Sequence, residues 1–219
     1  MRTAPTTKKK GLGQKNLYDH ITGVILAGGL SKRYGQNKAF LELDGARIID
    51  RITAEMKTIF RRVVVITNRK ADYEYLEVPV FEDLIEGLGP LGGIFTGLMT
   101  ISDQAGFFVP CDMPFFSEQL VRHMVGIKDN HAAVVPSGAT GIEPLHALYS
   151  QSCLDPIRGL IKAQRYQVRL FFQQVSVRYV TLDEISKFIA PGKAFLNINT
   201  PEEFARIQSL LTEQNKMET

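Results

Sequence analysis

The stretch "ITGVILAGGLSKRYGQNK", residues 21–38, joins an apolar run to a pair of glycines and then to several cations. Its first seven residues, 21–27, are rich in β-branched side chains and predict a buried strand. The glycines that follow lack side chains, so their backbone N–H groups can approach an anion closely. Ligands bind beyond the carboxyl ends of strands in an open parallel sheet, which is where these glycines lie. The stretch therefore predicts a phosphate-binding loop, and a glycine-rich turn with solvated cations is the alternative.

The rest of the chain alternates short β-rich runs with amphipathic segments, as a parallel sheet with helical crossovers requires. Residues 47–60 place apolar side chains at spacings of three and four, which predicts a helix. Ser117 is the expected cap of one later helix, and Thr200 with Glu203 forms the capping box of another. Further strands are expected over residues 61–67, 78–83, 106–112, 131–137, 143–149, 177–182 and 194–199, and further helices over 91–101, 117–126 and 200–211. The predicted fold class is α/β.

Length and charge limit the classes of function. The chain has 219 residues and a net charge of +3, but residues 1–20 carry five cations against one acid. We expect residues 1–20 to form a basic, disordered tail and residues 21–219 to form a single domain. The remaining, nearly neutral body argues against nucleic-acid binding. No apolar run approaches the roughly 20 residues that span a bilayer, so we expect no membrane association and a cytoplasmic location. Cys111 and Cys153 are expected to be free thiols.

Acidic side chains end two of the expected strands. Asp112, in "PCDMP", would lie across the sheet edge from the glycine pair. Mg²⁺ prefers carboxylate oxygens and is often held by one or two carboxylates together with substrate phosphates. Asp112 is therefore the expected Mg²⁺ ligand, and a turn-forming aspartate before Met-Pro is the alternative.

The second acid is Asp83, in "FEDLIEGLGPLGG", residues 81–93. The glycines of this stretch, Gly92 among them, would let the backbone approach a flat ring. A carboxylate can accept both N1–H and N2–H of guanine, and it is poorly matched to adenine. Asp83 therefore favours a guanine nucleotide, and a helix-leading turn whose acids suit the helix dipole is the alternative.

Two patterns in the C-terminal part are less decisive. Asn197 and Asn199, in "NINTPEEF", are two apart on an expected strand and would point to the same face, where one could reach a metal or a phosphate. Turn residues at a strand end are the alternative. If residues 155–170 were one helix, a cationic stripe able to hold an anion would form, but a solvated face is favoured because such stripes are common on exposed helices. Its members are Arg158, Lys162, Arg165 and Arg169.

Taken together, "LAGGLSKRYGQNKAFLELDG", "FEDLIEGLGPLGGI", "PCDMPF" and "LNINTPEE" resemble the molybdenum cofactor guanylyltransferase family, in the same order and over about residues 21–210. The first motif alone occurs, in variants, in related nucleotidyltransferases. The resemblance implies a three-layer α/β/α sandwich with a mostly parallel, Rossmann-like sheet. It also implies transfer of GMP from GTP to the phosphate of molybdopterin, with release of pyrophosphate.

The resemblance assigns roles by motif position. Catalytic roles fall to Arg33, Lys38 and Asp112, with Mg²⁺ on Asp112. Substrate contacts fall to Asn197 and Asn199, and residues 21–130 and 131–219 would be the GTP-binding and molybdopterin-binding halves. Nucleotide contacts are expected from Leu26, Ala27, Gly28, Gly29, Lys38, Asn68, Asp83, Gly92 and Asp112. Asn68 is included because Ile66 stands where family members often have a polar residue.

Two rival functions stay open at this point. A cytidylyltransferase of the same fold would use CTP, and a non-catalytic GTP-binding cofactor carrier would bind nucleotide without releasing pyrophosphate. In the favoured case GTP and molybdopterin are the substrates. Transient contacts with molybdenum-insertion and acceptor proteins are also expected, because the cofactor is labile.

Overall fold

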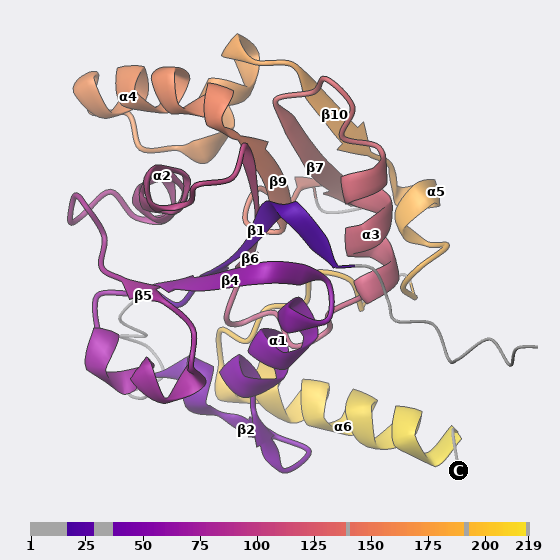
Figure 1. The fold of residues 1–219 in the computed structure, drawn as a ribbon. Coiled ribbons are helices and arrows are strands. Elements are labelled where there is room, and N and C mark those ends of the chain that lie inside the picture. Colours follow the sequence, from indigo (N-terminus) through magenta and orange to yellow (C-terminus); the bar gives the residue numbers. More distant parts are fainter. Residues whose placement is uncertain (1–16, 29–36, 139–140, 191–192, 218–219) are drawn as a thin grey trace, which may run out of the picture.

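The computed structural model describes residues 17–28, 37–138, 141–190 and 193–217, without the side chains of residues 212–217. Within these residues an eight-stranded sheet has the order β10-β7-β9-β6-β1-β4-β5, with β8 paired to β7 (Figure 1). The strands are β1 Tyr18–Leu26, β4 Phe60–Ile66, β5 Val80–Phe81, β6 Ala105–Pro110, β7 Ala133–Gly138, β8 Gly141–Ile142, β9 Ala147–Ser150 and β10 Val177–Val180. The expected mostly parallel sheet is confirmed.

Strand direction determines which residues meet. β1 runs parallel to β4 and β6, β4 runs parallel to β5, and β7 runs parallel to β10. β9 is antiparallel to both β6 and β7, so β7 points the same way as β6. The carboxyl ends of β1, β4, β5, β6 and β7 therefore share one edge of the sheet, called here the carboxyl edge. β9 begins at that edge.

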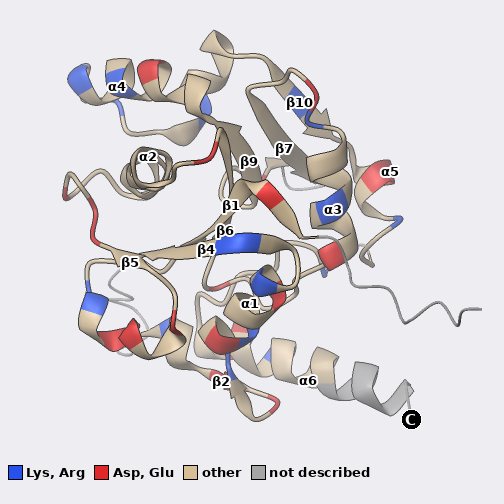
Figure 2. Ribbon diagram, viewed as in Figure 1, with Lys and Arg blue, Asp and Glu red and all other residues tan. Residues whose placement is uncertain are grey.

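Helices cover both faces of the sheet (Figure 1). One face carries α1 (Ile48–Lys57), α3 (Glu118–Gly126) and α6 (Pro201–Met217), whose apolar side chains share one core with the sheet. The other face carries α2 (Pro90–Thr100) and α4 (Leu154–Lys162), which pack in a second core. This arrangement confirms the three-layer α/β/α sandwich. Figure 2 shows charged residues of both signs on α4 and none on α2, which is buried along most of its length.

The caps and turns follow from local sequence. Ser117 Oγ accepts a hydrogen bond from Leu120 N at 3.2 Å, as expected for the cap of α3. Thr200 Oγ1 accepts from Glu203 N at 3.2 Å while Glu203 Oε2 accepts from Thr200 N at 3.0 Å, which is the expected capping box of α6. A hairpin of β2 (Glu42–Leu43) and β3 (Ala46–Arg47) turns through Asp44 and Gly45, both with positive φ.

The expected strand at residues 194–199 is wrong, and the condition for a cationic stripe is not met. Residues 194–199 form no strand, because the backbone N–H of Ile198 donates to the Asp112 carbonyl at 3.0 Å rather than to a neighbouring strand. The condition for a cationic stripe, one helix over 155–170, is not met: α4 ends at Lys162, and Gln164 takes a left-handed conformation with φ 53°. Arg165 and Arg169 lie beyond that end, so the four cations do not form one helical stripe.

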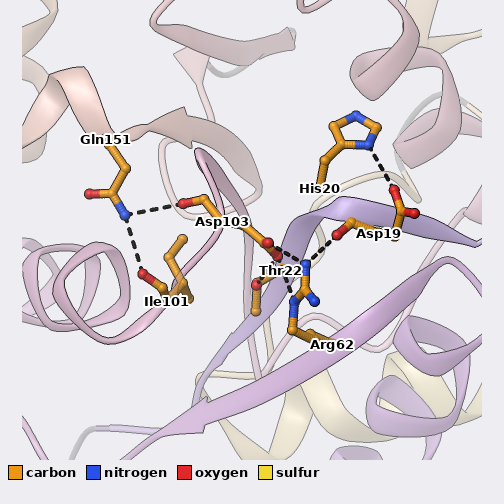
Figure 3. Close-up of polar contacts among 7 residues, drawn as sticks. All are labelled: Asp19, His20, Thr22, Arg62, Ile101, Asp103 and Gln151. Atoms are coloured by element: carbon orange, nitrogen blue, oxygen red, sulfur yellow. Dashed lines mark hydrogen bonds and ion pairs between the residues drawn. The ribbon is translucent and has the colours of Figure 1, made fainter.

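A polar network lies at the sheet edge opposite the carboxyl edge, near the amino end of β6 (Figure 3). Thr22 Oγ1 donates to Asp103 Oδ2 at 2.6 Å, and Arg62 Nε donates to the same oxygen at 2.9 Å. The Arg62 guanidinium also donates to Asp103 Oδ1 and to the Asp19 carbonyl. Gln151 Nε2 donates to the Asp103 carbonyl at 3.2 Å. These bonds join β1, β4, the α2–β6 connection and the 3-10 helix Gln151–Cys153 that precedes α4.

Cys111 and Cys153 are both free cysteines, as predicted. In the part of the chain that the structure describes, no helix is long and apolar enough to cross a membrane.

Candidate functional site

The end of β1 presents backbone rather than side chains to the carboxyl edge. The Leu26 carbonyl accepts from Cys111 N at 3.0 Å, and Ala27 N donates to the Ile66 carbonyl at 2.8 Å. The Leu26 side chain is buried so close to α2 that a Cβ on Gly93 would lie 3.1 Å from its Cδ2. Gly28 follows and is exposed. Gly29 and Arg33 lie outside the described residues, so their expected roles stay predictions.

Lys38 reaches the carboxyl edge from a short 3-10 helix, Lys38–Phe40. This helix is capped by Asn37, whose Oδ1 accepts from Ala39 N at 3.2 Å. The Lys38 ammonium donates to Asn199 Oδ1 at 3.1 Å, although the two residues are 161 positions apart. The structure therefore brings together a cation from the first motif and an amide from the last motif.

Asp112 follows β6 and lies beside this pair. Burial raises the pKa of its carboxyl, the Lys38 charge lowers that pKa, and the Glu203 charge raises it. The Asp112 carbonyl holds the segment before α6 in place through Ile198 N. We call Lys38, Asp112 and Asn199 the Lys38–Asp112 cluster. Asp112 is the residue in it with oxygen atoms suited to a hard cation.

Glu203 is a part of this arrangement that sequence reasoning assigned only to capping. Its Oε2 accepts from Asn199 N at 2.6 Å as well as from Thr200 N, so it fixes the backbone of the residue that Lys38 contacts. The capping-box pattern identified the bond to Thr200. Nothing local in the sequence indicates that the same carboxylate lies near Asp112, because β6 and α6 are distant along the chain.

Asn197 does not join the cluster in the way expected. With no strand at residues 194–199, alternation does not place Asn197 and Asn199 on one face. Asn199 contacts Lys38, whereas Asn197 makes no side-chain hydrogen bond to another described residue. The role of Asn197 in binding stays a prediction.

A second polar pair lies at the ends of β4 and β5. Asn68 Nδ2 donates to Asp83 Oδ2 at 3.1 Å, and Asp83 N donates back to Asn68 Oδ1 at 3.0 Å. Burial raises the pKa of the Asp83 carboxyl, while Asn68 and Thr96 lower it. Among the described residues Asp83 Oδ1 has no hydrogen-bond partner, although the atom is buried. The amide of Asn68 thus orients Asp83. Direct contact of Asn68 with a nucleotide stays a prediction.

The turn between Asp83 and α2 depends on glycine. Gly87 and Gly89 have φ of 80° and 58°, in the left-handed region that other residues rarely adopt. Gly89 caps α2, and Gly92 lies in the first helical turn, where its N donates to the Gly89 carbonyl at 3.0 Å. Gly92 is buried, and a Cβ there would lie 3.0 Å from Leu88 Cβ. Its expected nucleotide contact is untested.

The order of the strands fixes the distance between the two groups. Asp83 follows β5 and Asp112 follows β6, and β4 and β1 lie between these strands. Three strand spacings separate the two carboxyl ends by about 14 Å. An extended ligand could therefore meet Asp83 at one end and the Lys38–Asp112 cluster at the other.

His146 is buried just before β9 and is not part of either group. It lies among the rings of Phe107, Phe116 and Phe195, and burial lowers the pKa of its imidazole to about 4. These surroundings make His146 a core histidine. Its Nε2 has no hydrogen-bond partner among the described residues.

Comparison with known proteins identifies the family. The sequence profile of the MobA-like NTP transferase domain matches residues 23–177, well over half of the chain. The chain belongs to the MobA-like NTP transferase family. The matched range includes Lys38, Asp83 and Asp112, whereas Asn199 and Glu203 lie beyond it.

Individual relatives extend this match almost to the whole chain. The molybdenum cofactor guanylyltransferase of Desulfosudis oleivorans is 34% identical over 195 residues, which cover 88% of this chain and 96% of the relative. A relative from Pelotomaculum thermopropionicum is 35% identical over 185 residues, covering 84% of this chain and 90% of the relative. The crystal structure of molybdopterin-guanine dinucleotide biosynthesis protein A from Archaeoglobus fulgidus has a TM-score of 0.77 at 24% identity, covering 88% of this chain and 99% of that one. The last match supports the fold, and the first two support a nucleotidyltransferase.

Proposed function

We propose that this protein transfers GMP from GTP to the phosphate of molybdopterin, releasing pyrophosphate and forming the guanine dinucleotide form of the molybdenum cofactor. The observation that carries the proposal is the meeting of Lys38, Asp112 and Asn199 at the carboxyl edge of an NTP transferase fold. The names of the relatives supply the identity of the base and the acceptor.

The chemistry needs placement and charge neutralisation more than proton transfer. A terminal phosphate oxygen of molybdopterin attacks the α-phosphorus of GTP, and a new P–O bond forms. The bond from the α-phosphorus to the bridging oxygen breaks, and pyrophosphate leaves with the electron pair. The attacking oxygen is already anionic, so no general base is required. Lys38, and Arg33 by expectation, would stabilise the charge that develops on the leaving group.

The residues at the cluster suit a bound Mg²⁺. Asp112 is a half-buried carboxylate whose pKa is raised by burial, so a nearby cation would favour its charged form. One carboxylate together with substrate phosphates is a ligand set that Mg²⁺ commonly takes. When bound, the ion would withdraw charge from the phosphate oxygens. Lys38 and the backbone of residues 26–28 would then orient the phosphates.

Guanine selection would fall to Asp83. Its backbone and Oδ2 are fixed by Asn68, which orients the carboxyl group. A carboxylate accepts hydrogen bonds only, and the N1–H and N2–H edge of guanine donates two. Cytosine offers a single exocyclic amine. The alternative substrate CTP therefore leaves one interaction unmade.

The acceptor would approach from the molybdopterin-binding half, residues 131–219. The turn before β9, which holds Pro144, and the segment ending at Asn199 both lie at the carboxyl edge. A phosphate there would face the Lys38–Asp112 cluster. Transfer of a labile cofactor also favours transient contacts with the proteins that insert molybdenum and accept the product.

Pyrophosphate release in the presence of Mg²⁺ and molybdopterin, with GTP, CTP, ATP and UTP compared in parallel, tests this proposal. We expect release with GTP, and only a background rate when molybdopterin is omitted. Equal turnover of CTP would overturn the guanine assignment. Binding of GTP with no release under any condition would favour the cofactor carrier.

A further inference from the structure

The hydroxyl of Tyr73 links two segments of the first motif that are separated in the sequence. Tyr73 is buried and lies between two short 3-10 helices, Lys70–Asp72 and Glu74–Leu76. Its hydroxyl donates to the Ala27 carbonyl at 3.4 Å and accepts from Asn37 Nδ2 at 2.9 Å. One buried phenol therefore contacts both the end of β1 and the residue before Lys38.

Asn37 passes this contact on to Lys38. While its Nδ2 donates to Tyr73, its Oδ1 accepts from Ala39 N and caps the 3-10 helix that starts at Lys38. Both ends of the Asn37 amide are thus used, and its rotamer is fixed. The phenol is thus connected to the lysine ammonium in three steps: the hydrogen bond from Asn37, the cap that Asn37 forms on the 3-10 helix, and the Lys38 side chain itself.

The aromatic surroundings keep the Tyr73 ring in place. The ring of Phe40, at the end of the same 3-10 helix, lies 5.1 Å from the Tyr73 ring. The guanidinium of Arg47 lies over Phe40 at 5.5 Å and over Tyr75 at 5.6 Å. Burial raises the pKa of Tyr73 to about 12, so the phenol keeps its proton at neutral pH. It can therefore donate to one partner and accept from the other at the same time.

We infer that Tyr73 is a positioning residue for the transfer reaction: its hydroxyl sets Ala27 and, through Asn37, Lys38 at a fixed distance from each other. The backbone at the end of β1 and the lysine ammonium can then engage the phosphates of one nucleotide together. Pre-set geometry matters because small misplacements of a charge-stabilising group cost rate steeply. This inference rests on the proposed function and adds a residue that touches no substrate.

The first test removes only the hydroxyl, in Tyr73→Phe, with Tyr75→Phe as the matched control. The Tyr75 hydroxyl donates to Asp50 Oδ1 at 2.6 Å, on α1, and its side chain is exposed. Amide hydrogen exchange by NMR reads the geometry directly. We expect the Ala39 amide to exchange about threefold faster in Tyr73→Phe and at the wild-type rate in Tyr75→Phe. Unchanged exchange in Tyr73→Phe would overturn the inference.

The second test asks whether the effect passes through the lysine. We expect kcat/KM for GTP to fall about tenfold in Tyr73→Phe, but by less than twofold when the same change is made in Lys38→Ala. A full tenfold loss in the Lys38→Ala background would show that Tyr73 supports the fold in general, and would overturn the positioning role. If the wild-type protein releases no pyrophosphate from any nucleotide, the proposed function fails. The amide exchange result then still decides whether Tyr73 fixes Lys38.

Discussion

Asp103 and Asp112 flank β6 at its two ends, and their surroundings differ sharply. Asp103 accepts from Thr22 and twice from Arg62, and its side chain is only 8% exposed, so its charge is fully paired (Figure 3). Asp112 has Lys38 near it, but the Lys38 ammonium donates a hydrogen bond to Asn199, and burial raises the Asp112 pKa. A paired aspartate stabilises the fold, whereas a half-buried aspartate whose carboxyl oxygens are less fully paired is available to a ligand.

Asp112→Asn gives the largest expected effect. It removes the charge that would hold Mg²⁺, so we expect kcat/KM for GTP to fall by about 10³-fold. The folded protein disfavours the charged form of this carboxyl, because its pKa is raised in the folded state. The melting temperature should therefore stay the same or rise. Full activity in Asp112→Asn would show that the metal role is wrong.

Lys38→Ala is expected to lower kcat/KM by about 10²-fold, the usual cost of losing one charge-stabilising donor. The matched control is Lys57→Ala: Lys57 is the last residue of α1, and its Nζ donates to the carbonyl of Leu76, which ends a 3-10 helix. Pyrophosphate release with GTP measures both variants. A similar loss in Lys57→Ala would point to a general effect of charge.

Asp103→Asn should do the opposite of Asp112→Asn. An asparagine side chain has only one accepting oxygen, and its NH2 group cannot accept the hydrogen bonds that Thr22 and Arg62 donate to the second carboxylate oxygen. We therefore expect the melting temperature to fall by about 5 °C. The rate of pyrophosphate release should stay within about twofold of wild type at 20 °C. A large loss of turnover with normal stability would break the contrast between the two ends of β6.

Burial of His146 makes the free energy of unfolding depend on pH. In the unfolded chain its imidazole takes up a proton near pH 6.5, but in the folded protein its pKa is about 4. Stability is therefore complete above pH 6.5 and is lost as pH falls toward 4, by about 2 kcal/mol between pH 7 and pH 5. Urea unfolding at both pH values measures this, with His146→Phe as the comparison. An equal loss in His146→Phe would assign the effect to other groups.

Asp83→Asn is expected to have the smallest effect, on choice of base rather than on rate. An amide presents donors to the donor edge of guanine, so the preference for GTP over CTP should fall about tenfold. The ratio of kcat/KM for the two nucleotides measures it. Because Asn68 also donates to Asp83, Asn68→Ala should weaken the same preference. An unchanged ratio in both variants would place base selection elsewhere.

The regular half of the sheet is the half that could be predicted from sequence. The carboxyl ends of β1, β5 and β6 could be predicted because each strand is an apolar run that is followed by glycine or aspartate. Parallel pairing alone then brings these ends to one edge of the sheet. That reasoning placed Asp83 and Asp112 at this edge before any contact was known, and the family resemblance added Lys38; their roles stay predictions. It also identified both helix caps, because a cap is formed by residues three positions apart.

The C-terminal half was harder to predict, because its contacts are not periodic. "AFLNIN" alternates like a strand, yet the backbone N–H of its buried Ile198 donates to the Asp112 carbonyl and not to a neighbouring strand. The contacts of Lys38 with Asn199 and of Tyr73 with Ala27 join residues 161 and 46 positions apart. Such pairs depend on where a turn ends, and nothing in the local sequence encodes that.

GTP labelled with ³²P at the α-phosphorus, incubated with the protein, Mg²⁺ and molybdopterin, tests the central claim most directly. The account predicts that the label moves into a molybdopterin dinucleotide, in amounts equal to the pyrophosphate released, and that Asp112→Asn stops this transfer. Label that stays in GTP, or appears as free GMP without a dinucleotide, would contradict it.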